Sequence, residues 1–234
     1  LEAAVRHTSD TGLVAADAVA HALRVSSSTY SAREEWAHAF THGIGALFAL
    51  GALVLLVVFA KGAAAITSGA VFGTTLVLTY VVSTVYHSVP AHRPDVKRAL
   101  QRLDHCCIYL LIAGSYTPFT LVTLPEDWGW SLFFVVWGLA LLGVLLKHTP
   151  LGNNSWISNA SYLGMGWIAV VAFEPLVASL PTNALALLVA GGLSYTFGVV
   201  FFVWERLPYH HVIWHLFVLA GSTLHVLAVL LYVV

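Results

Sequence analysis

The sequence predicts an all-α integral membrane protein, a bundle of seven transmembrane helices with its N-terminus in the cytoplasm and its C-terminus outside. Three observations lead to this prediction: the composition, the length of the charge-free stretches and the distribution of basic residues. Charged residues make up 9% and hydrophobic residues 59% of the 234, whereas a soluble domain carries about 25% charged residues. The composition therefore suits lipid as a solvent better than water.

Seven long charge-free stretches divide the chain. Each has at least 19 residues, and about 20 helical residues cross the roughly 30 Å of hydrocarbon in a bilayer. The alternating segments of about 10 residues that build membrane β-barrels are not found in the sequence. In chain order the predicted spans are Trp36–Ala60, Gly62–Tyr86, His105–Pro125, Trp128–Leu146, His148–Phe173, Pro175–Trp204 and Leu207–Val234.

Each predicted span is bounded by charged side chains, because a charge is unfavourable in hydrocarbon. The third span is opened by Asp104, and the fifth ends before Glu174. In chain order, the charged positions between consecutive spans are Lys61, the segment Arg93–Asp104, Glu126 with Asp127, Lys147, Glu174, and Glu205 with Arg206.

The basic residues predict the orientation. With the N-terminus inside, Lys61 is the one basic residue of the 10 in the chain that faces outward. The positive-inside rule therefore favours a cytoplasmic N-terminus, and we expect a multi-pass protein of the plasma (inner) membrane. The other nine are Arg6, Arg24, Arg33, Arg93, Lys97, Arg98, Arg102, Lys147 and Arg206.

The chain divides into a polar cytoplasmic segment, residues 1–33, and a membrane domain, residues 34–234. Asp10 is a plausible N-cap for a short helix over Leu13–Leu23, and the serines and threonine of residues 26–29 indicate a linker. No compact apolar core follows a basic start, so we expect no cleavable signal peptide.

Polar side chains from distant parts of the sequence gather in the predicted cytoplasmic half of the membrane. In this topology His87 lies in the last turn of the second span, with Ser83 four residues deeper, and Asp104 begins the third. At ~1.5 Å per helical residue, His87 and His215 reach a similar depth. The remaining members of this group are Glu35, His38 and His42 at the start of the first span and His211 at the start of the seventh.

His211 and His215 are four residues apart, so on a helix they share one face and two imidazoles can bind one metal ion. This spacing alone is weak evidence, since His38 and His42 have it as well. A catalytic zinc takes three protein ligands and keeps a position for water. His87 is the best-placed third ligand.

Simpler interpretations exist for every one of these residues. A histidine near a membrane surface often hydrogen-bonds to headgroups or water, which is our expectation for His210. His225 is expected to make a packed polar contact deep in the seventh span. Asp104 would stabilise a helix N-terminus, and Ser83 would bond to a carbonyl of its own helix. Ionisable groups in a bundle nevertheless indicate a functional site by default.

These residues resemble the haemolysin III branch of the progestin and adipoQ receptor family, which is grouped with the alkaline ceramidases. The similarity covers essentially all seven spans, from Glu34 to Val234. Its motifs occur in order: Glu35 to Gly43, the Ser-xxx-His element Ser83–His87, Leu103-Asp104 with Gly114–Pro118, and the His-xxx-His element His211–His215.

The resemblance implies a zinc ion (Zn2+) held by His87, His211 and His215 near the cytoplasmic face, with Ser83 and Asp104 close by. It also implies hydrolysis of lipid amides, with membrane lipids and a ceramide-like lipid amide as partners and no role for nucleic acid. At His38 the sequence departs from the family pattern, in which Asn is usual. The role of the first-span cluster Glu35, His38 and His42 is therefore left open.

Our mechanistic hypothesis assigns catalytic roles to Asp104 as general base and Ser83 as the group that orients the water or a ligand. Two alternatives remain. The protein is instead a non-enzymatic sensor, receptor, membrane-homeostasis or cytolytic protein with a structural zinc, or its histidines hold haem. A resident pore is disfavoured, since no span carries an obvious polar stripe. The fourth zinc ligand separates the first two classes: a protein ligand indicates a structural site, and an open position indicates catalysis.

Overall fold

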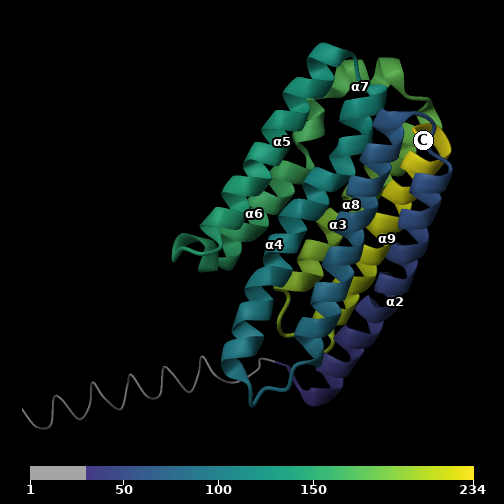
Figure 1. Cartoon of the computed structure of the whole chain (residues 1–234). Helices are drawn as coiled ribbons and strands as arrows, with labels where there is room; N and C mark the ends of the chain where they lie inside the picture. The colour runs from purple at the N-terminus through teal and green to yellow at the C-terminus, as the bar shows by residue number, and fades with distance from the viewer. Residues whose placement is uncertain (1–29) are drawn as a thin grey trace, which may run out of the picture.

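The computed structural model describes residues 30–234, and these residues form an elongated bundle of long helices (Figure 1). The short helix predicted over Leu13–Leu23 and most of the segment 1–33 lie outside the described residues. The elements are α2 (Ala32–Val58), α3 (Ala63–Ser88), α4 (Pro94–Pro118), the π-helix η1 (Phe119–Thr123), α5 (Glu126–Leu146), η2 (Leu151–Asn153), α6 (Ser155–Gly166), the 3₁₀ helix η3 (Ile168–Ala172), α7 (Phe173–Ser179), α8 (Thr182–Val203) and α9 (His210–Tyr232).

The predicted all-α fold with seven membrane-spanning helices is confirmed. Seven helical spans are long and apolar enough to cross a membrane, and the described residues contain no β-strand. Two of the spans are composite: α4 continues into η1, and the fifth consists of α6, η3 and α7. Large apolar side chains face outward along the spans, as expected for lipid contact. Examples are Leu47 on α2, which is 72% exposed, and Phe134 on α5, which is 65% exposed.

The start of the third span was predicted wrongly. It begins at Pro94, not at His105, because Pro94 stands at the helix start, where its missing N–H is not needed. Dividing the sequence at charges removed the three turns of α4 that carry Lys97, Arg98 and Arg102. Asp104 is therefore an interior residue of α4, and the interpretation of Asp104 as an N-terminal capping carboxylate is wrong.

The end of the fifth span was also predicted wrongly. The span runs to Ser179 and includes Glu174, which we had taken as its boundary. The helical path changes from α to 3₁₀ at Ile168 and returns to α at Phe173, so that Pro175 falls in the first turn of α7. A proline is tolerated there because first-turn N–H groups have no intrahelical partner.

The helix α2 buries one stripe of small and polar side chains. The stripe recurs every three or four residues, the period of one helix face, and it packs most extensively on α3 and also contacts α9. Its members are His38, Ala39, His42, Gly45, Ala49, Ala52 and Leu56. Helix α2 therefore presents its histidines to the helices that carry the predicted metal ligands.

Hydroxyl groups connect three helices halfway along the bundle. The Tyr80 hydroxyl on α3 donates to Ser222 Oγ on α9 at 2.9 Å, and the Tyr195 hydroxyl on α8 lies 2.9 Å from the same Oγ. Tyr80 is fully buried. Because polar groups in hydrocarbon are satisfied only by one another, these bonds fix the register of α3 against α8 and α9.

The ends of four helices meet at one end of the bundle. The starts of α2, α4 and α9 and the end of α3 lie together at the bottom of Figure 1, and the C-terminus lies at the other end. We call this the histidine end, because it carries His38, His42, His87, His211 and His215. The grouping of these residues at one depth, predicted from the topology, is confirmed.

Candidate metal centre

Three buried histidines from two helices come together at the histidine end. His87 lies in the last turn of α3, and His211 and His215 lie in the first two turns of α9. One ring nitrogen of each residue lies within 4.8 Å of one ring nitrogen of both others. The structure thus brings together the three residues predicted as metal ligands.

The Nδ1 atom of each histidine contacts a second polar group. His87 Nδ1 lies 2.8 Å from Glu35 Oε2, and His215 Nδ1 lies 3.1 Å from Thr41 Oγ1. His211 Nδ1 lies 3.3 Å from the hydroxyl of Tyr30. All three partners belong to α2 or to the residues just before it, so α2 orients rings carried by α3 and α9.

These contacts define the tautomers of two rings. A carboxylate only accepts hydrogen bonds, so His87 Nδ1–H donates to Glu35. The Thr41 hydroxyl already donates to backbone carbonyls of its own helix, those of Ala37 and His38, at 2.9 Å each, so it accepts from His215. In neutral rings Nε2 then carries the lone pair, which is the arrangement of metal-binding histidines.

Lys97 anchors Glu35 in turn. Its Nζ lies 2.7 Å from Glu35 Oε1, donates to the carbonyl of Val89 at 3.1 Å, and stands 5.0 Å from the centre of the Tyr86 ring. The Glu35 side chain is 13% exposed and that of Lys97 12%. This largely dry ion pair holds the carboxylate against His87.

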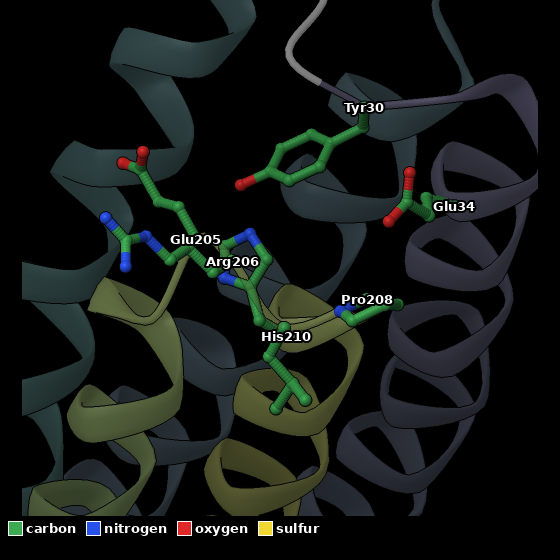
Figure 2. A pocket seen from close by; sticks show the side chains of 7 residues that line it. Tyr30, Glu34, Glu205, Arg206, Pro208 and His210 are labelled. Carbon is green, nitrogen blue, oxygen red and sulfur yellow. The ribbon is translucent and has the colours of Figure 1, made fainter.

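Tyr30 closes the histidine end from the side of the α8–α9 connection. Burial raises the pKa of its hydroxyl well above the usual range, so that the group stays protonated. Figure 2 shows the Tyr30 ring beside a pocket of about 310 Å³ that is also lined by Glu34, Glu205, Arg206 and His210. Glu34 Oε1 accepts a hydrogen bond from the N–H of Tyr209 at 3.3 Å and so connects the starts of α2 and α9.

His38 and His42 belong to the same cluster. His38 is fully buried and His42 is 5% exposed. Neither ring nitrogen of either residue has a hydrogen-bond partner among the described residues. The His42 ring stacks on His215 with ring centres 3.4 Å apart and planes inclined by 12°. His38 and His42 of the first-span cluster, whose role the sequence left open, therefore pack directly against the predicted ligands.

Ser83 and Asp104 face one another beside this cluster. Ser83 is 1% exposed and lies one turn from His87 on α3, and its side chain interacts with the half-buried carboxylate of Asp104 on α4. Asp104 does not belong to the group of metal-binding atoms formed by the three histidines. Asp104 is thus connected to the three-histidine group only through Ser83 and is not a fourth member of it.

Two further histidines of α9, His210 and His225, contact backbone carbonyls of α8. His210 was expected to hydrogen-bond to headgroups or water, but it is 6% exposed, and its Nδ1 donates to the carbonyl of Phe201 at 3.1 Å. The left-handed conformation of Tyr209 turns the chain so that His210 points back toward α8. His225 makes the expected packed contact, with Nε2 3.3 Å from the carbonyl of Leu188.

A second cavity of about 430 Å³ leads from the surface of the bundle to the centre. Its walls include Glu35, Trp36, Ala39, His87 and Lys97, and therefore join the predicted ligand His87 to the outward face of α2. Trp36 is 77% exposed on that face. A volume of this size is within the range of small-molecule sites.

The residues present fit a bound metal ion. His87 Nε2 is buried and has no hydrogen-bond partner within the described chain, whereas Nδ1 of the same ring is bonded to Glu35. A buried nitrogen without a partner is unfavourable, and three imidazole nitrogens within 4.8 Å of one another suit a borderline-soft divalent cation. Tyr30 and Thr41, which complete the arrangement, were missed because their roles come from contacts with residues more than 170 positions away.

Comparison with known proteins shows similarity to two bacterial hemolysin-3 proteins and a human relative. Hemolysin-3 of Bacillus cereus is 42% identical over 213 residues, which cover 90% of this chain and 96% of that protein. The Hemolysin-3 homolog of Bacillus subtilis (strain 168) is 42% identical over 208 residues, 88% of this chain and 97% of the homolog. The human Monocyte to macrophage differentiation factor is 29% identical over 163 residues, 68% of this chain and 67% of that protein.

The family resemblance inferred from the motifs is thus confirmed. A family model described as Haemolysin-III related matches residues 30–226, which include all seven spans except the last turns of α9. The chain belongs to the haemolysin III-related family of multi-pass membrane proteins.

Proposed function

We propose that this protein is a zinc-dependent membrane hydrolase that cleaves the amide bond of a ceramide-like lipid. The observation that carries the proposal is the convergence of His87, His211 and His215 within 4.8 Å, each with its Nδ1 held by a second group. Three neutral imidazoles with such partners are the ligand set of a catalytic zinc. When bound, zinc supplies a Lewis acid that polarises a carbonyl and increases the acidity of water.

The proton transfers fall to Asp104. Its carboxylate interacts with Ser83, one turn from His87, and is not in the group of metal-binding atoms, so it could accept a proton from water and return it to the leaving amine. Ser83, which is buried one helical turn from His87 and interacts with Asp104, would hold this carboxylate in place. Both residues come from helices that pack on one another, which keeps their separation constant.

The lipid class is supported by the cavity beside His87. An amphiphile that enters along α2 would meet the exposed ring of Trp36 with its chain and the Lys97–Glu35 pair with its polar head. Its amide would then lie at the shallow depth of His87. The distribution of basic residues supports a site at the cytoplasmic face of the plasma membrane.

Metal analysis of the purified protein tests the zinc site. We expect one zinc per chain and its loss in His215→Ala, while His225→Ala, which changes a buried histidine of the same helix, keeps the metal. A protein without stoichiometric zinc, or one that retains all of it after His215→Ala, would rule the site out.

Turnover of a fluorescent ceramide in detergent or vesicles tests catalysis. Asp104→Asn should retain zinc and lose at least about 100-fold in turnover, the usual share of a general base. Asp95→Asn, which changes an exposed carboxylate on the same helix, is the matched control. Equal turnover in Asp104→Asn and the unmodified protein would reject Asp104 as the base.

The second candidate function is that of a non-enzymatic sensor or receptor-like protein in which zinc ties the helices together. The observation in its favour is His38, a further buried imidazole without a hydrogen-bond partner in the described chain. A closed ligand set of four protein atoms is typical of structural zinc. Absence of turnover for any lipid amide together with full zinc occupancy would favour this candidate.

A further inference from the structure

The ring of Tyr30 packs against three histidines at the starts of α2 and α9. Its centre lies 4.8 Å from that of His38, 5.2 Å from His211 and 5.7 Å from His210. Its hydroxyl lies 3.3 Å from His211 Nδ1. A single aromatic ring therefore covers one predicted metal ligand and the buried imidazole next to it.

Tyr30 also belongs to the walls of both cavities at the histidine end. Glu34, Glu205 and His210 line the pocket of about 310 Å³ with it, and His87 lines the cavity of about 430 Å³. Figure 2 shows the Tyr30 ring between Glu34 on one side and Glu205 on the other. The ring thus stands between the smaller, polar pocket and the histidine centre.

The charges of the smaller pocket suit a cation. Its walls hold two carboxylates, those of Glu34 and Glu205, and one guanidinium, that of Arg206. His210 donates its Nδ1–H to the carbonyl of Phe201, so Nε2 keeps its lone pair in the neutral ring. A pocket with an excess of negative charge raises the local concentration of cations.

The larger cavity is less suited to a cation. Lys97 pairs there with Glu35 at 2.7 Å, so the two charges cancel. Its other walls include the apolar side chains of Trp36, Ala39 and Val89. A hydrated ion is unfavourable beside apolar walls, whereas the chain of an amphiphile is not. The two cavities therefore differ in the kind of molecule that each admits.

The position of Tyr30 in the chain allows its ring to move. Helix α2 begins at Ala32, and Ser31 is its N-cap, with the Ser31 hydroxyl accepting from the N–H of Glu34. The capping box thus fixes the start of the helix without Tyr30. Because Tyr30 precedes the helix, its side chain can rotate without unwinding a helical turn, and rotamer changes are fast compared with such unwinding.

We infer that the pocket lined by Glu34, Glu205 and His210 is the route by which a divalent metal ion enters and leaves the histidine centre, and that the ring of Tyr30 is the gate on this route. The inference rests on the zinc binding proposed above and not on hydrolysis. A gate sets the barrier to exchange and not the stability of the bound metal. Opening it therefore changes the rates of loading and release by the same factor.

Rapid-mixing kinetics on the full chain in detergent test the gate. Loading is followed with zinc and a fluorescent zinc indicator, and release is followed by mixing the zinc-loaded chain with excess chelator. Tyr30→Phe and Tyr30→Ala both lose the hydroxyl contact with His211, so they share its effect on affinity and differ in the ring. Both rates should be at least about tenfold higher in Tyr30→Ala than in Tyr30→Phe. Trp204→Ala, which removes an exposed ring from the α8–α9 connection, is the matched control.

Two further variants test the route. Glu205→Gln should slow loading at least about twofold at low ionic strength, because the pocket then attracts cations less. Asp95→Asn, which removes an exposed carboxylate at the same end of the bundle, should not. Ala91→Trp, which narrows the larger cavity at its exposed rim, should leave the loading rate unchanged.

The remaining outcomes contradict separate points. Faster release with equal loading in Tyr30→Ala relative to Tyr30→Phe would overturn the gate, because the ring would then only stabilise the bound state. Slower loading in Ala91→Trp would overturn the route and assign it to the larger cavity. A chain that takes up no zinc would overturn the zinc proposal and the gate with it, whereas gated exchange without turnover of a lipid amide would remove the hydrolase alone. If Tyr30→Ala does not fold, Tyr30→Leu takes its place.

Discussion

Glu35 on α2 accepts a hydrogen bond from Nδ1 of His87 on α3 at 2.8 Å, and its other oxygen lies 2.7 Å from Lys97 Nζ on α4. One carboxylate thus joins three helices and fixes the orientation of the ring of His87, a predicted metal ligand. The residues are 52 and 62 positions from Glu35 in the sequence.

Replacing Glu35 by Gln should lower zinc affinity by about 10–100-fold, the usual effect of losing a partner of a ligating histidine. The amide neither binds Lys97 as an ion pair nor increases the basicity of His87. Chelator competition measures the affinity, and Asp95→Asn removes a carboxylate at the same end of the bundle as the control. Unchanged affinity in Glu35→Gln would show that His87 needs no such partner.

Thr41→Val should weaken zinc binding by about tenfold, because valine keeps the shape of threonine and removes the hydroxyl that accepts from His215 Nδ1. Thr41→Ser retains the hydroxyl and should retain the affinity. Measuring both variants separates the hydrogen bond from packing: a loss of equal size in the two would contradict the assigned role.

Gly69→Ala should destabilise the bundle by about 1–3 kcal/mol through overpacking. A Cβ at this position of α3 would stand 2.7 Å from the carbonyl oxygen of Leu56 on α2, and backbone does not move aside easily. Gly51→Ala on α2, where a Cβ meets nothing within 4 Å, should have little effect on stability. Thermal unfolding in detergent measures both, and equal midpoints would refute the close contact.

Lys147 should make stability increase with pH in the alkaline range. Its Nζ donates to Ser158 Oγ at 2.6 Å and to the carbonyl of Gly152 at 3.0 Å in a site that is 5% exposed. Burial lowers the pKa of this amine below its ordinary value of 10.5. Between the lowered and the ordinary pKa the unfolded chain binds more protons than the folded one, so unfolding becomes less favourable as pH rises.

Thermal unfolding between pH 8 and about 10.5 measures this effect. Lys147→Met should reduce the slope of the unfolding midpoint against pH, and Lys61→Met, which changes an exposed lysine at the other end of the bundle, should leave it unchanged. A slope that is the same in Lys147→Met and in the unmodified protein would assign the pH dependence to other groups.

Composition and charge spacing were sufficient for the fold class, because a lipid environment requires each crossing segment to be apolar and helical by itself. They were not sufficient for helix ends. Lys97 and Arg102 lie on a helix that extends beyond the apolar layer, and Glu174 lies within a span whose path changes to 3₁₀, so a charge marks neither end there. Helix ends depend on capping and on neighbouring helices, which single-sequence patterns do not contain.

For the centre, the sequence determined which of the 12 histidines could share a depth, since the helical rise and the topology fix how far His87 and His215 lie from the ends of their spans. Only the tertiary structure decided what surrounds them. It placed Tyr30, Glu35 and Thr41 against the three Nδ1 atoms, packed the ring of His38 against that of His87, and buried His210 against Phe201. The physical reason is that depth is a property of each helix alone, whereas the rotation of α2 against α3 and α9 is set by the packing of side chains from all three.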